Sequence, residues 1–241
     1  MHGTGSRNRL TPHQLELYPG SNLFARLAQA ICKASVLPRK ELHEAWEVAR
    51  LVRRRFRGGR VVDLACGHGL LAHVMLLLDD TAPTALAVDT RLTRNHEPLS
   101  LAIVDAWPRL QGRVEFREAR LQDIELFKDD VVVSAHACGS LTDDILERAR
   151  SVGARVAVLP GCQELRDRGD LFGWLDGSLA VDVERATRLR AAGYRIWTQA
   201  IPAEISPKNR LLMGAAIGSP LRVGAVQEAT AGDVDDDDDA A

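Results

Sequence analysis

From residue 60 onward, short runs of apolar and β-branched residues alternate with longer stretches whose apolar positions recur at helical spacing. The short runs predict strands at Val61–Leu64, Thr84–Asp89, Val114–Ala119, Val131–Ala135 and Arg155–Leu159. The stretches between and after them predict helices at Leu70–Leu78, Leu99–Leu110, Ser140–Ser151 and Val181–Ala192. Two last runs, Tyr194–Ile201 and Arg210–Ala216, are joined by a connection too short for a crossover helix, which predicts an antiparallel pair. The pattern predicts an α/β, doubly wound, Rossmann-like sheet of seven mostly parallel strands.

Two amphipathic segments precede the first strand. Ser21 or Asn22 is placed to cap a helix that runs to about Ser35, and a second helix is expected over Lys40–Phe56. A helical pair ahead of a strand predicts a cap over the sheet edge instead of a separate domain. We therefore expect an N-terminal helical extension over residues 1–57, the main domain over 58–218 and an acidic tail over 219–241.

Composition sets the broad class. Hydrophobic residues make up 46% and charged residues 27% of the 241 positions, which is typical of a soluble globular chain. No apolar run approaches the ~20 residues that a bilayer span needs, and no signal peptide opens the chain, so a cytoplasmic location is expected. The four cysteines are not closely paired in sequence, which gives no support for a disulfide framework or a zinc site.

Charge is unevenly distributed along the chain. The net charge is −2, and six aspartates lie among the last nine residues, so residues 1–232 carry −2 + 6 = +4. Such a run predicts a solvated, disordered end, and a self-inhibitory tail that mimics a polyanion is the alternative. An arginine cluster, defined as Arg50, Arg53, Arg54, Arg55 and Arg57, ends the second predicted helix. It suits either a solvated helix end or an RNA or DNA contact, although no recognised nucleic-acid module accompanies it.

The stretch RVVDLACGHGLLA, residues 60–72, combines a strand, a small-residue turn and a helix start. Glycines allow close backbone approach and a helix N-terminus offers unpaired N–H groups, which favours an adenosine-containing ligand. The pattern Gly67-x-Gly69-x-x-Ala72 also fits the dinucleotide fingerprint, but that fingerprint carries no acid at the position of Asp63. Asp89 ends the next predicted strand about 20 residues after Gly69, where a ribose-binding carboxylate is expected.

Residues 63–69, DLACGHG, resemble the first motif of class I S-adenosylmethionine-dependent methyltransferases, acid-x-Gly-x-Gly-x-Gly, with Ala65 in place of the first glycine. Three further segments are similar to a methyltransferase-domain group that includes ribosomal RNA adenine dimethylase-domain-containing and glutathione S-transferase C-terminal-domain-containing proteins: residues 136–143 (HACGSLTD), 180–194 and 206–210. The resemblance covers about residues 58–218. It implies S-adenosyl-L-methionine as cofactor.

The resemblance also implies the cofactor contacts. Asp63, Ala65, Cys66, Gly67 and Gly69 would hold the methionine end, and Asp89 with Thr90 beside it would hold the ribose. Where the family commonly has an acid near the adenine, this chain has Arg120, so we expect Leu121 to pack on the adenine and Gln122 or Asp123 to bond its edge. His136 and Ala137, after the fourth strand, complete the predicted cofactor-binding residues.

Three residues are the candidates for catalysis: His136, Lys208 and Asn209. His136 follows the fourth strand and is able to take a proton at neutral pH, although a bond to cofactor or backbone explains it equally well. Lys208 and Asn209 are expected at the pocket rim, and turn chemistry alone also accounts for Asn209. The loops after strands one, four and five bring together two histidines and three cysteines: His68, His136, Cys66, Cys138 and Cys162. Their spacing gives no support for a metal site, and none is predicted.

Three functions follow as hypotheses. The first is an S-adenosylmethionine-dependent methyltransferase that acts on an unidentified acceptor, either RNA or a small molecule. The second is a non-catalytic S-adenosylmethionine- or nucleotide-binding protein that binds RNA through the arginine cluster. The third, a nicotinamide-dependent oxidoreductase, is supported by the Gly-x-Gly-x-x-Ala pattern alone.

Overall fold

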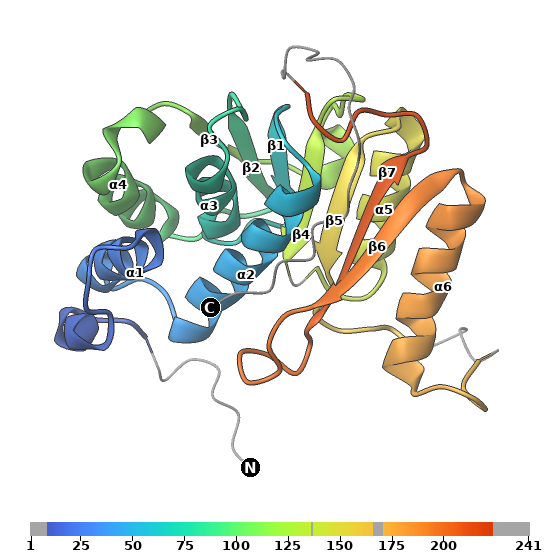
Figure 1. Ribbon diagram of the computed structural model, residues 1–241, viewed down its shortest axis with the longest axis horizontal. Coiled ribbons are helices and arrows are strands. Elements are labelled where there is room, and N and C mark those ends of the chain that lie inside the picture. The colour runs from blue at the N-terminus through green and yellow to red at the C-terminus, as the bar shows by residue number, and fades with distance from the viewer. Residues whose placement is uncertain (1–8, 136, 166–170, 224–241) are drawn as a thin grey trace, which may run out of the picture.

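The computed structural model describes residues 9–135, 137–165 and 171–223 (Figure 1). Its strands are β1 (Val61–Leu64), β2 (Ala85–Asp89), β3 (Val114–Glu118), β4 (Val131–Ala135), β5 (Arg155–Leu159), β6 (Tyr194–Ala200) and β7 (Arg210–Ala216). Its helices are α1 (Leu23–Ala34), α2 (Arg39–Arg55), α3 (Leu70–Leu78), α4 (His96–Ala106), α5 (Ser140–Val152) and α6 (Gly177–Ala191). Short 3-10 helices lie at η1 (Pro12–Leu17), η2 (Pro108–Leu110) and η3 (Leu121–Asp123).

The strands of the described chain form one seven-stranded sheet in the order β3-β2-β1-β4-β5-β7-β6. The first five strands are parallel to their neighbours, and β7 is antiparallel to both β5 and β6. The predicted doubly wound, mostly parallel sheet with a C-terminal antiparallel hairpin is therefore confirmed. Because the chain order reverses between β1 and β4, the loops after these strands diverge and leave a crevice at the carboxyl edge, where the parallel strands end.

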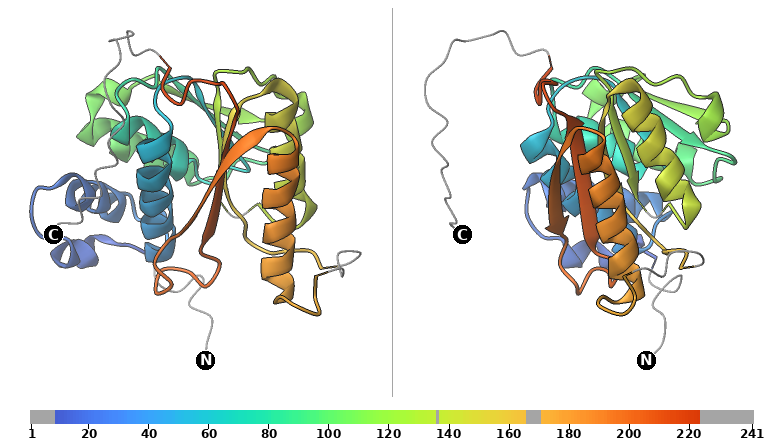
Figure 2. Two further views of the ribbon diagram at one scale, coloured as in Figure 1. Left: turned by 45° about the vertical axis from the view of Figure 1, so that its right-hand side comes forward. Right: turned by 90° about the vertical axis from the view of Figure 1, so that its right-hand side faces the viewer.

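Helices cover both faces of the sheet (Figures 1 and 2). One core contains side chains of α1, α2, α3 and α4, and the other contains side chains of α5 and α6. The central strands are buried on both faces, with β1 and β5 covered along their whole length. Burial on both faces explains why these strands are continuous apolar runs and not alternating patterns.

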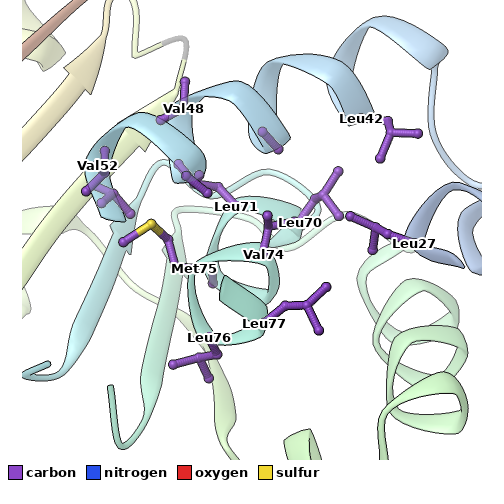
Figure 3. Packing of buried hydrophobic residues seen from close by; sticks show 14 of the residues in the cluster. Leu27, Leu42, Val48, Val52, Leu70, Leu71, Val74, Met75, Leu76 and Leu77 are labelled. Atoms are coloured by element: carbon purple, nitrogen blue, oxygen red, sulfur yellow. The ribbon is translucent and has the colours of Figure 1, made fainter. Parts of the chain in front are cut away.

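The two N-terminal helices share the core of the sheet. Leu42, Val48 and Val52 of α2 pack in one cluster with residues of α3 such as Leu70 and Val74 (Figure 3). Helix α1 packs against α4, and its N-cap is Asn22, whose side chain accepts a hydrogen bond from Ala25 N at 2.8 Å. The predicted capping of this helix is confirmed. Helix α2 begins beside the turn that follows β1, at the carboxyl edge of the sheet, and ends just before β1, at the amino edge.

Two helices differ from their predicted extents. Helix α6 begins at Gly177 instead of Val181, because the Asp176 side chain accepts hydrogen bonds from Ser178 N and Leu179 N and so caps an additional turn. The predicted helix over Leu99–Leu110 is divided into α4, which begins at His96, and η2, which begins at Pro108. Proline lacks the N–H group that a continuing helix requires.

One arginine joins three chain segments at the amino edge. Arg155 of β5 is buried, and its guanidinium donates to the carbonyl oxygens of Arg57 and Gly58 at 2.8 Å, of Asp129 at 2.7 Å and of Leu221 at 3.2 Å. Burial lowers the pKa of Arg155. None of the helices in the described ranges is long and apolar enough to cross a membrane.

Candidate cofactor site

The turn between β1 and α3 has three residues with left-handed backbone: Ala65 (φ 60°), Gly67 (φ 54°) and Gly69 (φ 73°). The turn is held to the sheet because Cys66 N donates to Val88 O at 3.0 Å, and it closes on itself through Gly69 N and Cys66 O at 2.8 Å. Glycine adopts this backbone freely, whereas alanine does so at a cost of ~1 kcal/mol. The structure thus keeps the conformation of a glycine at the position where this chain has Ala65.

The two glycines serve different purposes. A Cβ on Gly69 would lie 2.4 Å from Cε1 of Phe116, so this glycine lets α3 approach β3 closely. A Cβ on Gly67 would meet no atom within 4 Å. Gly67 therefore faces open space, so a ligand can approach its backbone closely.

Asp89 lies at the end of β2, beside the turn. Its Oδ2 accepts a hydrogen bond from Gly67 N at 3.0 Å, and the Thr90 hydroxyl donates to its Oδ1 at 3.4 Å. The carboxylate is thus held at the mouth of the turn by the glycine that faces open space. Two acceptor oxygens in this position match the two hydroxyls of a ribose.

Asp63 lies at the same edge but is buried beneath the turn. Its Oδ2 accepts a hydrogen bond from Ala72 N in the first turn of α3, at 3.2 Å. Burial and, to a smaller extent, the neighbouring Asp89 carboxylate raise the pKa of Asp63 to about 7, against the lowering effect of the Ala72 bond. Asp63 therefore fixes the relative position of β1 and α3. It is not among the described residues that line the cavity beside the glycine turn.

A cavity of about 530 Å³ opens at this edge. The turn residues Ala65, Cys66 and Gly67 form one wall together with Asp89, and Ala135 lies at the end of β4. The opposite wall is the start of α2, which contributes Lys40, Glu41 and Glu44. The volume lies within the range typical of small-molecule and cofactor sites. Cavities of similar volume lie between α5 and α6 and between α6 and β6, away from the glycine turn.

The polar residues of α2 were not predicted as site residues. Lys40 Nζ lies 3.4 Å from Glu44 Oε1, and Glu41 Oε2 lies 3.2 Å from His68 Nδ1 in the turn. In the sequence, Lys40 and Glu44 have the four-residue spacing of an ordinary surface pair, so the pattern gives no sign of a cavity. Only the packing of α2 on α3 brings them to the glycine turn.

The other predicted cofactor residues are not among the described residues that line this cavity. Leu121 is buried at the start of η3, and Gln122 and Asp123 are exposed. Ala137 is buried, and its carbonyl accepts hydrogen bonds from the Thr142 hydroxyl at 2.8 Å and from Gly161 N at 3.2 Å. Their contacts with a cofactor remain a prediction.

The candidate catalytic residues divide into two groups. His136 lies outside the described residues. Lys208 Nζ donates to Gln163 Oε1 at 3.3 Å, and Asn209 Nδ2 donates to Ile201 O at 2.9 Å, which closes the hairpin between β6 and β7. Neither is among the described residues that line the cavity. A role in catalysis for these three residues remains a prediction.

In the described part of the chain, no three histidine, cysteine, aspartate or glutamate side chains are grouped so that they could hold a metal ion. The loop cysteines and His68 therefore form no metal site there. Cys138 and Cys162 are exposed. Burial, Asp63 and Asp89 all raise the pKa of the Cys66 thiol. Cys66 is therefore a poor nucleophile at neutral pH, since the thiolate is the reactive form.

The arginine cluster is partly neutralised by its neighbours. Arg50 pairs with Glu47 at 2.6 Å, and Arg57 lies 3.7 Å from Asp79. Arg54 and Arg55 are exposed, and Arg55 Cζ lies 5.8 Å from the ring centroid of Trp197 on β6. Phe56, the aromatic residue within the cluster, is buried, so the ring beside Arg55 comes from a strand distant in sequence.

The strand order, the antiparallel last strand and the glycine turn facing Asp89 define the class I methyltransferase type of Rossmann-like fold. The profile of a family described as methyltransferase domain matches residues 40–167, and the chain belongs to this family. The match begins within α2, so the family profile includes the helix that walls the cavity.

Solved structures support the fold. An O-methyltransferase family protein from Burkholderia thailandensis is 20% identical over 86% of this chain, with a TM-score of 0.50. The apo form of the S-adenosylmethionine-dependent methyltransferase SibL is 18% identical over 86% of this chain, also with a TM-score of 0.50. The chain spans 63% and 66% of these two structures, less than two thirds of either. A search of the curated proteins finds no match.

Proposed function

We propose that the protein transfers a methyl group from S-adenosyl-L-methionine to an acceptor that is either RNA or a small molecule. The observation that carries the proposal is Asp89, a carboxylate held at 3.0 Å by Gly67 N at the open side of the glycine turn. Membership of the methyltransferase-domain family supports the same conclusion and gives no support to a nicotinamide-dependent oxidoreductase.

The residues present fit this cofactor. Asp89 would accept both ribose hydroxyls, and Gly67 leaves room for the ligand because no atom lies within 4 Å of its Cβ position. When bound, S-adenosylmethionine supplies a methyl group on a sulfonium cation, which a nucleophile displaces directly. Asp89, Glu41 and Glu44 around the cavity make it favourable for a cation. The chain's main task is then to align the acceptor with the methyl group and to exclude water.

An acceptor that carries a proton at its nucleophilic atom also needs a base. We propose His136 for this step, with Lys208 and Asn209 orienting the acceptor from the loop between β6 and β7. Substitution of His136 by Asn would then slow methyl transfer while leaving the affinity for S-adenosylhomocysteine unchanged. An equal loss of both would instead favour a cofactor-binding role for this histidine.

Calorimetric titration tests the cofactor assignment. Wild-type protein should bind S-adenosylhomocysteine and not NADPH, and Asp89→Ala should weaken that binding roughly 100-fold, because two charge-assisted hydrogen bonds are lost. The matched control is Glu118→Ala, which removes an exposed acid from the end of the neighbouring strand β3. Equal affinity of Asp89→Ala and wild type would exclude the ribose assignment.

The acceptor class requires a transfer experiment. Methyl transfer from labelled cofactor to a fractionated cell extract would identify the fraction that contains the acceptor. Sensitivity of the label to ribonuclease would assign RNA, and a label that survives ribonuclease and protease would assign a small molecule. A cytoplasmic location remains a prediction, which fractionation of cells that express the protein would test.

A second candidate is a non-catalytic S-adenosylmethionine-binding protein that binds RNA. The observation in its favour is the position of Arg55 and Arg195 over Trp197, at 5.8 and 6.0 Å, since bases stack on aromatic rings flanked by cations. This function predicts that Arg54→Gln with Arg55→Gln weakens binding to single-stranded RNA. Arg188→Gln, an exposed arginine on α6, is the matched control. No methyl transfer to any fraction would favour this candidate over the first.

A further inference from the structure

The start of α2 forms the cavity wall that faces the glycine turn, and it carries the paired side chains Lys40 and Glu44. We propose that these two residues bind the amino-acid end of the methyl donor, with the Lys40 ammonium on the α-carboxylate and the Glu44 carboxylate on the α-ammonium. This assignment rests on the proposed function. It extends the cofactor site to a helix that precedes the first strand.

The position of Asp89 sets the direction of the donor across the cavity. The ribose belongs at the end of β2, and the cavity extends from there past β1 to Ala135 at the end of β4. Helix α2 contacts β4, and its first turns line the same cavity as Ala135. A donor whose ribose lies at Asp89 therefore places its amino-acid end toward β4 and the first turns of α2.

The charges of the wall match a zwitterion. The donor's amino-acid end has one α-ammonium and one α-carboxylate. Lys40 is the only lysine or arginine among the described residues that line the cavity, so it is the cation available to the carboxylate. Glu41 is already engaged with His68 at 3.2 Å, and Asp89 with Gly67 N at 3.0 Å. Lys40 and Glu44 form a pair of opposite charges in this wall.

The two partners differ in how firmly they are held. The Glu44 side chain is 2% exposed and the Lys40 side chain is 39% exposed. Glu44 lies one turn before Val48 on α2, and both side chains are buried, so the position of Glu44 is fixed by the packing of the helix. Val48 belongs to the core cluster shown in Figure 3. The flexible Lys40 is free to move from Glu44 to a bound carboxylate, while Glu44 then accepts from the ammonium. A zwitterion inserted in this way keeps both protein charges neutralised.

Two ligands that differ in the amino-acid end test the assignment. S-adenosylhomocysteine has this end, and 5′-methylthioadenosine keeps the adenosine and the thioether but lacks it. By calorimetric titration, Lys40→Gln and Glu44→Gln should each weaken S-adenosylhomocysteine roughly tenfold and 5′-methylthioadenosine less than about twofold. Lys40→Arg should retain affinity for S-adenosylhomocysteine, because it keeps the cation.

Matched controls separate this effect from general changes. Lys33→Gln removes an exposed lysine from α1, and Glu47→Gln removes an acid from the next turn of α2, where it pairs with Arg50. Both should leave the affinities for both ligands unchanged. Thermal unfolding of Glu44→Gln checks that the variant is folded, and Lys40→Gln is the primary test since its side chain is partly exposed.

Three outcomes would overturn the assignment. Equal weakening of both ligands by Lys40→Gln would mean that Lys40 acts on the shape of the cavity. Unchanged binding of S-adenosylhomocysteine in both variants would mean that the Lys40–Glu44 pair serves α2 alone, while the proposed function stands. Failure of the wild-type protein to bind either nucleoside would overturn the proposed function together with this inference.

Discussion

The carboxylates on the two halves of the sheet have opposite surroundings. At the ends of β1 and β2, Asp63 and Asp89 accept hydrogen bonds from backbone N–H groups of Ala72 and Gly67. Beside β5 and β7, Asp143 and Asp182 lie around a buried arginine, Arg185 of α6. Asp89, Asp143 and Asp182 each line a cavity, but Asp89 is held by a backbone N–H group, whereas Asp143 and Asp182 form a closed network of ion pairs with arginine.

The closed network compensates its own charge. Arg185 donates to both oxygens of Asp143, at 3.1 and 2.9 Å, and to Gly139 O at 2.9 Å. Arg210 Nε donates to Asp182 at 2.7 Å, and Gln163 bonds the same carboxylate. Buried charges with good geometry on all sides have a structural role. Asp89, which is supported by a backbone N–H group and lines the cavity beside the glycine turn, instead remains able to receive a ligand.

The largest expected effect tests the structural role of the network. Arg185→Met should lower the free energy of unfolding by about 3 kcal/mol, because Asp143 loses both of its bonds to the guanidinium. Denaturant unfolding measures the change. Arg188→Met, one turn along α6 and exposed, should change stability by less than about 0.5 kcal/mol. A loss of S-adenosylhomocysteine binding in Arg185→Met without a loss of stability would contradict the distinction between the two halves.

A smaller effect concerns the pH dependence of stability. Because the pKa of Asp63 is raised to about 7 in the folded protein, the folded state binds more protons than the unfolded state between pH 4 and 7. Its contribution to the free energy of unfolding therefore falls as the pH rises through this window. Asp63→Asn, which keeps an acceptor for Ala72 N, should be more stable than wild type by about 2 kcal/mol near pH 5.5 and about equal to it near pH 3.

His73 provides the internal check for that experiment. Burial lowers its pKa to about 4, so its contribution to stability is lost as the pH falls from about 6.5 toward 4, the opposite dependence. His73 is present in both proteins, and the difference between wild type and Asp63→Asn isolates the carboxylate. A difference that does not vary with pH would mean that Asp63 binds protons equally in the folded and the unfolded protein, so that folding does not raise its pKa.

The smallest effect concerns the turn itself. Ala65→Gly should raise the free energy of unfolding by about 0.5–1 kcal/mol, since Ala65 has a left-handed backbone with φ of 60°. The same substitution in a helix, Ala102→Gly in α4, should lower it by about 1 kcal/mol. If Ala65→Gly were destabilising, the turn would owe its geometry to the alanine methyl group instead of tolerating it.

The sequence by itself determined the strands, the helices and their order. Five of seven strands were buried runs bounded by turns, and the short link before Arg210 required an antiparallel pair, so local pattern was sufficient. It also located the turn that contains Gly67 and the acid Asp89, because a strand, a glycine turn and a helix start are contiguous in the chain. The additional turn of α6 was missed because a single capping residue, Asp176, decided it.

Tertiary structure alone decided which distant residues complete the site. Lys40 and Glu44 resemble a surface pair until α2 packs on α3 and turns them toward Gly67. Trp197 meets Arg55 only because β6 lies beside the end of α2, and the Asn209 amide reaches Ile201 O only because β6 pairs with β7. Each of these outcomes depends on contacts between segments far apart in sequence, which no local periodicity encodes.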